Sequence, residues 1–182
     1  MKFLLIIFCL LFTSVGWSKD VSMNDLVQKD GLYYEKLFIF FSKKDPFTGD
    51  IIGYMPGKIN KGKKEGEWLQ YWNNSQLRSR SNYKDGKQDG EWLRYHENGQ
   101  LSFKTSYRDG KEEGELLMYY WHGQLWWKWN YKDGEFDGEQ LDYYGNGQLS
   151  SKRSYKDGEF NGEWLNYFEN GQLNSKINYK DG

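Results

Sequence analysis

The sequence has very little cysteine, proline or histidine, and it has no excess of charge of either sign. Its 182 residues include one cysteine, two prolines and two histidines, and 25 Lys and Arg balance 26 Asp and Glu to a formal net charge of −1. The lone cysteine, Cys9, excludes an intramolecular disulfide framework. The balanced charge disfavours nucleic acid as a partner, because binding to a phosphate backbone requires clustered Lys and Arg.

Glycine and aromatic residues are abundant instead. The chain has 21 glycines, and Phe, Trp and Tyr make up 19% of it, whereas 28% of the residues are charged. This composition is too aromatic for a disordered chain and too polar for a thick hydrophobic core. We therefore expect an ordered protein whose order does not come from bulk hydrophobicity.

The first 18 residues have the outline of a secretory signal peptide. Lys2 precedes an apolar run over residues 3–12, and Gly16 and Ser18 stand where a cleavage site requires small residues. The run is shorter than the roughly 20 residues that span a bilayer, so an uncleaved membrane anchor is the weaker alternative. The sequence predicts an exported chain, periplasmic or secreted, with a signal peptide over residues 1–18.

The rest of the chain repeats with a period of 24 residues. Gly66, Gly90, Gly114, Gly138 and Gly162 begin five copies that align without an insertion. The copies span residues 66–89, 90–113, 114–137, 138–161 and 162–182, and residues 19–65 form an N-terminal segment. A fixed period of this length is the signature of stacked structural units.

Each copy predicts one antiparallel β-hairpin. Asn98-Gly99 and its counterparts separate two aromatic-rich runs, as in a two-residue turn with positive φ angles. Asp85-Gly86, with the residues up to Gly90, predicts a longer connection to the next hairpin. An isolated hairpin is marginal in water, so the five hairpins must pair edgewise. We expect an all-β fold, an elongated ribbon of stacked antiparallel hairpins.

A two-residue turn would also fix the register within each hairpin. Counted from the first glycine, position 7 would face 12, 6 would face 13, 4 would face 15, 3 would face 16 and 2 would face 17. In copy two, the more apolar face would carry Trp92, His96, Leu101, Phe103, Thr105 and Tyr107, and the other Glu91, Leu93, Tyr95, Ser102, Lys104 and Ser106. The basic residue at position 15 would form an exposed ion-pair ladder with the Glu at position 2.

The N-terminal segment breaks the period and predicts a cap on the first hairpin. Residues 32–41 and 50–54 alternate in polarity around Pro46 and Gly49, which suggests a degenerate capping hairpin, and residues 22–28 would form one helical turn or two. At the other end of the ribbon, Leu173–Tyr179 would be a sheet edge protected by lysines.

The repeated motifs Gly-Glu-Trp-Leu-x-Tyr, Asn-Gly-Gln-Leu and Tyr-Lys-Asp-Gly resemble the variant MORN repeat (membrane occupation and recognition nexus). Together with DGLYYEKLF and PFTGDIIG upstream, residues 30–182 resemble the bacterial MORN-variant family of antitoxin-type proteins from toxin–antitoxin systems. The resemblance implies an elongated β-hairpin ribbon that binds other proteins or, in some cases, acidic phospholipids. It implies no catalytic residues. The predicted signal peptide departs from that family, because export would separate the chain from a cytosolic toxin.

The polar residues do not converge into a catalytic, cofactor-binding or metal site. Catalysis needs unlike groups held at one place, whereas here the polar residues recur at fixed positions of every copy. His96 stands at position 7, where the other copies have Trp, Tyr or Phe, and we interpret it as an aromatic substitute. The acidic connection at residues 109–113 alternates with Lys and lacks the spacing of calcium ligands. We expect a protein that is not an enzyme and that has no cofactor or metal.

Copy three differs from the others and supplies the candidate binding patch. In the register above, Met118 would face Trp127 on one side of the sheet and Tyr119 would face Trp126 on the other, so both faces would be apolar. Aromatic anchors of this kind contribute most to protein interfaces. The alternatives are a thicker local core and a contact covered by the N-terminal segment. The candidate partner-binding residues are Met118, Tyr119, Trp121, Trp126, Trp127 and Trp129.

Three classes of function fit these observations. We favour an exported scaffold that binds a protein, which the resemblance suggests is a toxin. A membrane-surface binder needs clustered Lys and Arg, which the near-neutral charge argues against. A binder of cell-wall glycans is the third class, because exported aromatic repeats can stack on sugars. The sequence does not identify the partner or the oligomeric state.

Overall fold

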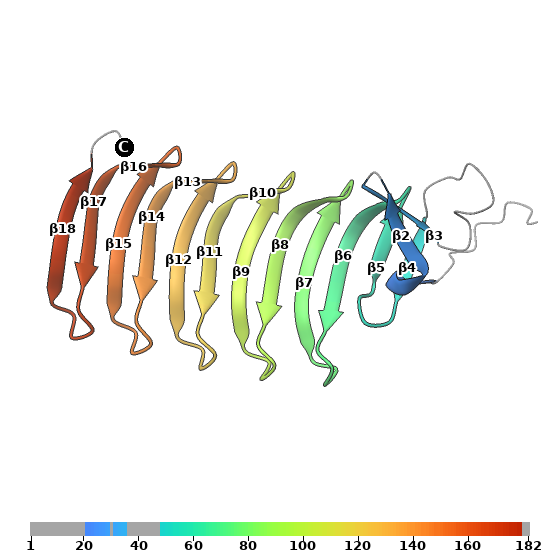
Figure 1. Ribbon diagram of the computed structural model, residues 1–182, viewed down its shortest axis with the longest axis horizontal. Helices are drawn as coiled ribbons and strands as arrows, with labels where there is room; N and C mark the ends of the chain where they lie inside the picture. The colour runs from blue at the N-terminus through green and yellow to red at the C-terminus, as the bar shows by residue number, and fades with distance from the viewer. Residues whose placement is uncertain (1–20, 30, 36–47, 180–182) are drawn as a thin grey trace, which may run out of the picture.

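The computed structural model describes residues 21–29, 31–35 and 48–179, so the predicted signal peptide lies outside the described residues. The described part is all-β except for one short 3-10 turn, and it forms an elongated ribbon of stacked hairpins, as predicted (Figure 1). Within this part of the chain, no helix has the length and apolar character needed to cross a bilayer.

The five hairpins follow one another along the ribbon with the predicted period. Their strands are β6 (Lys63–Tyr71), β7 (Leu77–Lys84), β8 (Lys87–Tyr95), β9 (Leu101–Arg108), β11 (Gly114–Tyr119), β12 (Leu125–Lys132), β14 (Gly138–Tyr143), β15 (Leu149–Lys156), β17 (Gly162–Tyr167) and β18 (Leu173–Tyr179). Two-residue strands lead into hairpins three, four and five: β10 (Lys111–Glu112), β13 (Glu135–Phe136) and β16 (Glu159–Phe160). The N-terminal elements are β1 (Val21–Ser22), the 3-10 turn η1 (Met23–Asp25), β2 (Leu26–Lys29), β3 (Leu32–Glu35), β4 (Gly49–Ile52) and β5 (Gly57–Asn60).

The hairpins belong to a single continuous sheet. Its strand order is β1-β4-β5-β6-β7-β8-β9-β11-β12-β14-β15-β17-β18, and only β1 and β4 pair in parallel. The hairpin β2–β3 forms a separate two-stranded sheet at the N-terminal end. Over hairpins two to five, the described residues therefore form one layer, and both faces of that layer meet solvent. Among the described strands, β18 pairs only with β17, and it is the predicted sheet edge.

The two turns of each repeat have the reverse of their predicted roles. Asp85-Gly86 is the tight two-residue turn, because its φ angles are 51° and 85° and it directly joins the paired strands β7 and β8. Asn98-Gly99 belongs to a three-residue loop instead: only Gly99 has a positive φ (81°), and the backbone N of His96 donates to the carbonyl of Gln100 at 2.8 Å. Such a loop ends in a left-handed residue that begins a bulge.

A β-bulge follows this loop in every hairpin and changes the register near it. In hairpin two, Leu93 pairs with Lys104, which confirms the predicted pairing of positions 4 and 15. Positions 3 with 16 and 2 with 17 are confirmed in the same way. Tyr95, however, pairs with Leu101 and not with Ser102, so the predicted pairs 6 with 13 and 7 with 12 are wrong. Position 13 is the extra residue, and the alternation of side chains between faces breaks there.

Side chains at positions 7 and 9 join each hairpin to the next. They donate hydrogen bonds to backbone carbonyls of the following hairpin, always 23 residues further along the chain. The position-7 donors are Trp72, His96, Tyr120 and Tyr144, with donor–acceptor distances of 3.2, 3.2, 3.0 and 2.8 Å. The position-9 donors are Asn74, Asn98, His122 and Asn146. A carbonyl can only accept, so both histidines carry a proton on Nε2 and have a structural role.

The opposite face of the sheet carries the predicted ladder of ion pairs. Each basic residue at position 15 bonds to the glutamate at position 2 of its own hairpin, as Lys104 does to Glu91 at 3.0 Å. The hydrogen bond that Lys104 donates to Glu91 and the negative charge of that carboxylate raise the pKa of Lys104, and the charge of Glu115 in the next hairpin adds to this effect. The five pairs are Arg80–Glu67, Lys104–Glu91, Lys128–Glu115, Lys152–Glu139 and Lys176–Glu163. These pairs are exposed, so each contributes about 0–1 kcal/mol.

The N-terminal segment packs against the first hairpin and supplies most of the buried apolar core. Trp68 is only 3% exposed beneath it. The predicted pairing of residues 32–41 with 50–54 is wrong for the described residues, since β3 pairs with β2 and β4 pairs with β5. Residues 36–41 lie outside the described part. The predicted helical segment is one 3-10 turn followed by β2. The core residues are Val21, Leu26, Ile51, Ile59 and Trp68.

The loop of hairpin four offers a matched test of the left-handed position. Gly147 has a φ of 86°, whereas Gly145 in the same loop does not have a positive φ. Gly147→Ala should lower the free energy of unfolding by about 1–2 kcal/mol, because a Cβ atom is strained in this region. Gly145→Ala should leave it unchanged, since the added Cβ would meet nothing closer than His122 at 3.9 Å. Urea unfolding followed by tryptophan fluorescence measures both. Equal losses for the two variants would contradict this turn geometry.

The joints between hairpins can be tested at Tyr144. Tyr144→Phe removes the 2.8 Å hydrogen bond to the carbonyl of Tyr167 and keeps the ring. We expect it to lower the free energy of unfolding by about 0.5–1.5 kcal/mol. Phe168, at the same position of hairpin five, forms no such bond among the described residues, so Phe168→Tyr is the control and should have little effect. Thermal unfolding followed by far-UV circular dichroism compares them; a neutral Tyr144→Phe would show that the joint contributes nothing.

Candidate binding face

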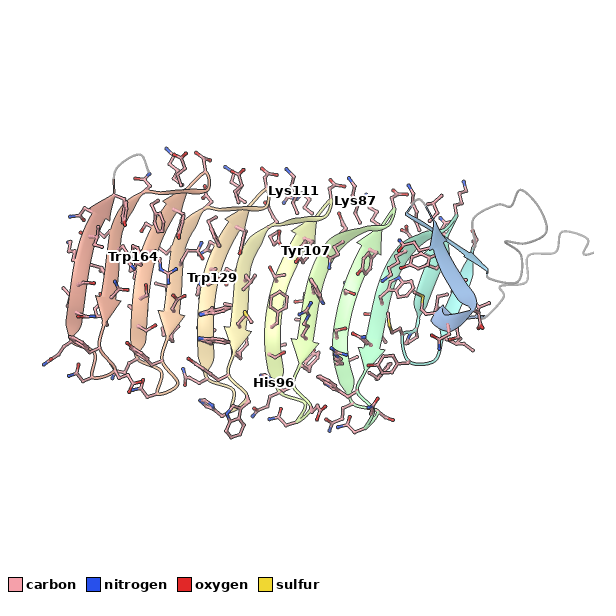
Figure 2. All side chains as sticks on the ribbon, in the orientation of Figure 1. Lys87, His96, Tyr107, Lys111, Trp129 and Trp164 are labelled. Atoms are coloured by element: carbon pink, nitrogen blue, oxygen red, sulfur yellow. The ribbon has the colours of Figure 1, made fainter. Side chains whose placement is uncertain are left out.

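One face of the ribbon carries nearly all of its tryptophans. We call it the aromatic face, and it consists of the side chains at positions 3, 5, 7, 14, 16 and 18 together with the bulge residue at position 13. Figure 2 shows Tyr107, Trp129 and Trp164 along the middle of the ribbon, with His96 near the edge that carries the Asn-Gly loops. Lys87 and Lys111 lie at the opposite edge, beside the Asp-Gly turns. The residues of this face differ from hairpin to hairpin. The opposite face, which carries the ladder of ion pairs and which we call the ion-pair face, has nearly the same residues in every hairpin.

Three tryptophans of hairpin three form a stacked row, which we call the tryptophan ridge. The ring centroids of Trp126 and Trp127 are 4.1 Å apart with their planes tilted by 31°, and those of Trp127 and Trp129 are 4.7 Å apart with an angle of 15° between the planes. Tyr120 also stacks on Trp126, with ring centroids 5.2 Å apart. All three tryptophans are half-buried.

The ridge brings together most of the predicted patch and separates the rest. Met118 pairs with Trp127 across the hairpin, as predicted. The prediction that Tyr119 faces Trp126 on the other side is wrong, because the bulge pairs Tyr119 with Leu125 and moves Trp126 to the aromatic face. Tyr119 lies on the ion-pair face, where it acts on the pKa of Lys104. Trp121 is in the loop and is 71% exposed.

The aromatic contacts continue from the ridge to the end of the ribbon. The ring centroid of Phe136 is 5.6 Å from that of Trp129 and 5.0 Å from that of Tyr155. The ring centroid of Phe160 is 4.5 Å from that of Tyr155 and 5.6 Å from that of Trp164. Phe136 and Phe160 belong to the two-residue strands β13 and β16, which place them between consecutive hairpins. The aromatic face is therefore continuous from hairpin three to hairpin five.

Hairpin four places polar groups within this aromatic surface. Asp142 accepts a hydrogen bond from Trp129 Nε1 at 2.8 Å and forms an ion pair with Arg153. The Arg153 guanidinium also lies over the ring of Trp164, 5.6 Å from its centroid. Gln140 is 2% exposed and donates to the carbonyl of Asn130 at 3.0 Å. The ridge thus borders a polar cluster whose charges are already paired with each other.

The described part of the N-terminal segment packs on the first hairpin and not on the ridge. Its buried residues contact Trp68, and Tyr83 packs beside them. The alternative in which this segment covers the central patch therefore does not hold for the described residues. A thick local core is also absent there, since Leu116 is the only described apolar residue outside the N-terminal cluster that is buried.

Sequence reasoning missed two arginines on the aromatic face. Arg78 and Arg94 line a hollow between the first two hairpins, with a volume of about 380 Å³. Arg78 is at bulge position 13 of its hairpin, so the predicted register gave no reason to place it beside Trp72. The sequence signal was a basic residue at a position where three of the other four copies have Ser or Asn.

Four segments of the chain, at residues 64–85, 88–109, 136–157 and 160–181, match the family model described as MORN repeat variant. These four segments are similar to variant MORN repeats. The hairpin with the tryptophan ridge lies between the second and third of these segments. No curated protein matches the chain. Among solved structures, it is similar to one titled "Crystal structure of GtfA/B complex bound to UDP and GlcNAc", with 15% identity and a TM-score of 0.26. That similarity covers 80% of this chain and 28% of the other.

Two tyrosines at position 18 of their hairpins have raised pKa values. Burial raises the pKa of Tyr107, and the charge of Glu112, which accepts its hydrogen bond at 3.1 Å, raises it further. Burial also raises the pKa of Tyr131, and Glu112 adds to that effect. No group of three His, Cys, Asp or Glu residues in the described ranges could hold a metal ion. These tyrosines stabilise the fold in their neutral form.

The raised pKa of Tyr107 gives an alkaline limit to stability. A raised folded-state pKa contributes stability that is present below the unfolded value of 10.0 and is lost as the pH rises through the folded value. We expect the free energy of unfolding to fall above about pH 10, and to fall less steeply in Tyr107→Phe, which cannot ionise at this position. Tyr54→Phe, at an exposed tyrosine, is the control. Urea unfolding at several pH values measures the slopes, and an equally steep fall in both variants would refute this effect.

Proposed function

We propose that this chain is a non-enzymatic scaffold that binds a protein partner along the aromatic face of its MORN repeats. The observation that carries the proposal is the tryptophan ridge, a stacked row of rings on one face of a single-layer sheet with no second layer of described residues over it. Aromatic clusters of this kind are enriched at the centres of protein interfaces.

The first hairpin supports a polypeptide as the occupant of this face. There the aromatic face is already covered by segments of the same chain, whose Val21 and Leu26 pack with Trp68 in a buried cluster. Apolar side chains from an extended or hairpin segment therefore fit this surface at one hairpin. We propose that a partner's segment covers the equivalent surface at hairpins three to five.

Sugars and membranes fit the face less well. A sugar stacks on a free ring face, whereas the ring of Trp127 is in contact with both Trp126 and Trp129, at centroid distances of 4.1 and 4.7 Å. A membrane surface attracts clustered basic residues at about 1 kcal/mol each, but the ladder on the opposite face pairs every lysine or arginine at position 15 with a glutamate.

The proposal extends to location and to the class of partner. The predicted signal peptide supports a periplasmic or secreted protein, and the resemblance to antitoxin-type proteins supports a toxin as the partner. Cell fractionation of a C-terminally tagged chain tests the location. The identity of a partner that co-purifies with the tagged chain tests the class.

The binding face is tested with two aromatic variants on opposite sides of the same hairpin. The co-purifying partner is identified, purified and titrated against the chain by isothermal calorimetry. Trp127→Gln should weaken binding by at least about tenfold, or ~1.4 kcal/mol, because it removes the centre of the ridge. Tyr119→Gln, on the ion-pair face, should leave the affinity within about twofold. Far-UV circular dichroism and thermal unfolding check that both variants keep the β fold.

Three outcomes would contradict the proposal. Equal affinity of the wild type and Trp127→Gln would remove the ridge from the interface. Stronger loss in Tyr119→Gln would assign binding to the ion-pair face. Flotation with phosphatidylserine vesicles, or glycan-array binding, that depends on Trp127 would replace the protein partner with a lipid or a sugar.

A further inference from the structure

The hollow between the first two MORN repeats differs from the rest of the aromatic face because it is basic. It lies where β7 meets β8, and Arg78 of β7 and Arg94 of β8 both line it. Trp72 and Trp92 form its apolar walls, and Gln70 and Ser79 supply further polar groups. No aspartate or glutamate is among the residues that line it.

Each guanidinium in the hollow lies over the ring of a tryptophan. Arg78 lies over the ring of Trp72 at 4.5 Å, and Arg94 lies over the ring of Trp92 at 4.2 Å. Trp72 is itself fixed by its hydrogen bond to the carbonyl of Tyr95, at 3.2 Å. Stacking occupies the flat face of a guanidinium and leaves its N–H edge free to donate. Both arginines are therefore oriented, with donors available for a ligand.

Neither arginine has an acidic partner among the described residues. Every other arginine of the five hairpins forms an ion pair with one: Arg80 with Glu67, Arg108 with Glu113 and Arg153 with Asp142. Arg78 and Arg80 are two residues apart on the same strand, yet only Arg80, on the opposite face, has a partner. The hollow thus concentrates two positive charges that the chain itself does not neutralise.

We infer that this hollow binds a carboxylate from an acidic segment of the protein partner. The inference rests on the proposed function and adds the charge of the partner and its direction along the ribbon. A planar carboxylate matches the donor edge of a guanidinium, and such charge-assisted hydrogen bonds are stronger than neutral ones. One acidic side chain of the partner enters the hollow and accepts hydrogen bonds from Arg78 and Arg94.

The distance from the hollow to the tryptophan ridge sets the spacing of the partner's residues. The hollow lies between β7 and β8 and the ridge lies on β12, which is three to four strands further along the sheet. Strands are about 4.8 Å apart, so the separation is roughly 15–20 Å. An extended peptide covers this in about five or six residues at ~3.3 Å each. The partner segment therefore places its acidic residues about five or six positions from its apolar anchor.

Synthetic peptides test this arrangement directly. Fluorescein-labelled 14-residue peptides carry a Glu-Glu pair and a Leu-Phe pair separated by two to eight Gly and Ser residues, and a matched series replaces Glu-Glu with Gln-Gln. Fluorescence anisotropy with the purified chain gives each dissociation constant. We expect the Glu-Glu peptides to bind at least about tenfold more tightly than their Gln-Gln counterparts. Binding should be strongest when the acidic and apolar pairs are about five or six positions apart, and it should weaken as the salt concentration rises.

Arginine variants assign the preference to the hollow. Arg78→Gln and Arg94→Gln should each remove most of the difference between the Glu-Glu and Gln-Gln peptides. Arg80→Gln is the matched control, because it removes the same charge from the opposite face, and it should keep the difference. Circular dichroism checks the fold. If Arg94→Gln is unstable because it loses the contact with Trp92, the test rests on Arg78→Gln.

Four outcomes would overturn the inference. The first two are equal affinity for the Glu-Glu and Gln-Gln peptides, and a loss of that difference in Arg80→Gln as large as in Arg78→Gln. The other two are binding of phosphoserine peptides or phosphatidylserine vesicles in place of the Glu-Glu series, and no binding of any peptide. Peptides that bind irrespective of charge, and that Trp127→Gln weakens, would overturn the carboxylate site and leave the proposed scaffold function standing. The scaffold function itself is tested separately, by the affinity of the native partner for the wild type and for Trp127→Gln.

Discussion

The bulge that follows each Asn-Gly loop decides which side chains share a face of this protein. One extra residue on the second strand interrupts the alternation of faces, so the side chain at position 13 joins those at positions 7 and 14. Trp126 enters the tryptophan ridge for this reason, and Arg78 comes to lie over Trp72 for the same reason. With unbroken alternation both residues would lie among the ion pairs, and neither candidate site would exist.

The absence of a second layer makes the joints between hairpins as important as the strands. Apart from the N-terminal cluster around Trp68, nearly all apolar side chains are half-buried, and their contacts run sideways to the next hairpin. The backbone ladder, the donors at positions 7 and 9 and the aromatic contacts through Phe136 and Phe160 all act between neighbours. Stability in such an array is close to a sum of nearest-neighbour terms, so no single interior core holds the ribbon together.

The sequence was sufficient for the features that depend on period and was insufficient for those that depend on one turn. The 24-residue spacing predicted five hairpins, and the register far from the loop predicted the ion pair of Glu91 with Lys104. Asn98-Gly99 and Asp85-Gly86 are equally good two-residue turns by local propensity, and only the hydrogen bonds that flank them separate their roles. The error in the loop then placed Trp126 on the ion-pair face, opposite Tyr119, and hid Arg78. The pairing of β2 with β3 was missed because residues 19–65 have no period to constrain it.

The uniform joints have a consequence for how recognition changes in such a chain. Each hairpin meets the next through donors at the same two positions, backbone carbonyls as acceptors and the same offset of 23 residues, so the framework does not depend on which hairpin comes first. The basic hollow and the ridge are local differences carried by individual modules. Duplication, deletion or reordering of whole modules would therefore alter what the surface recognises, and at what distance, without a new fold having to evolve.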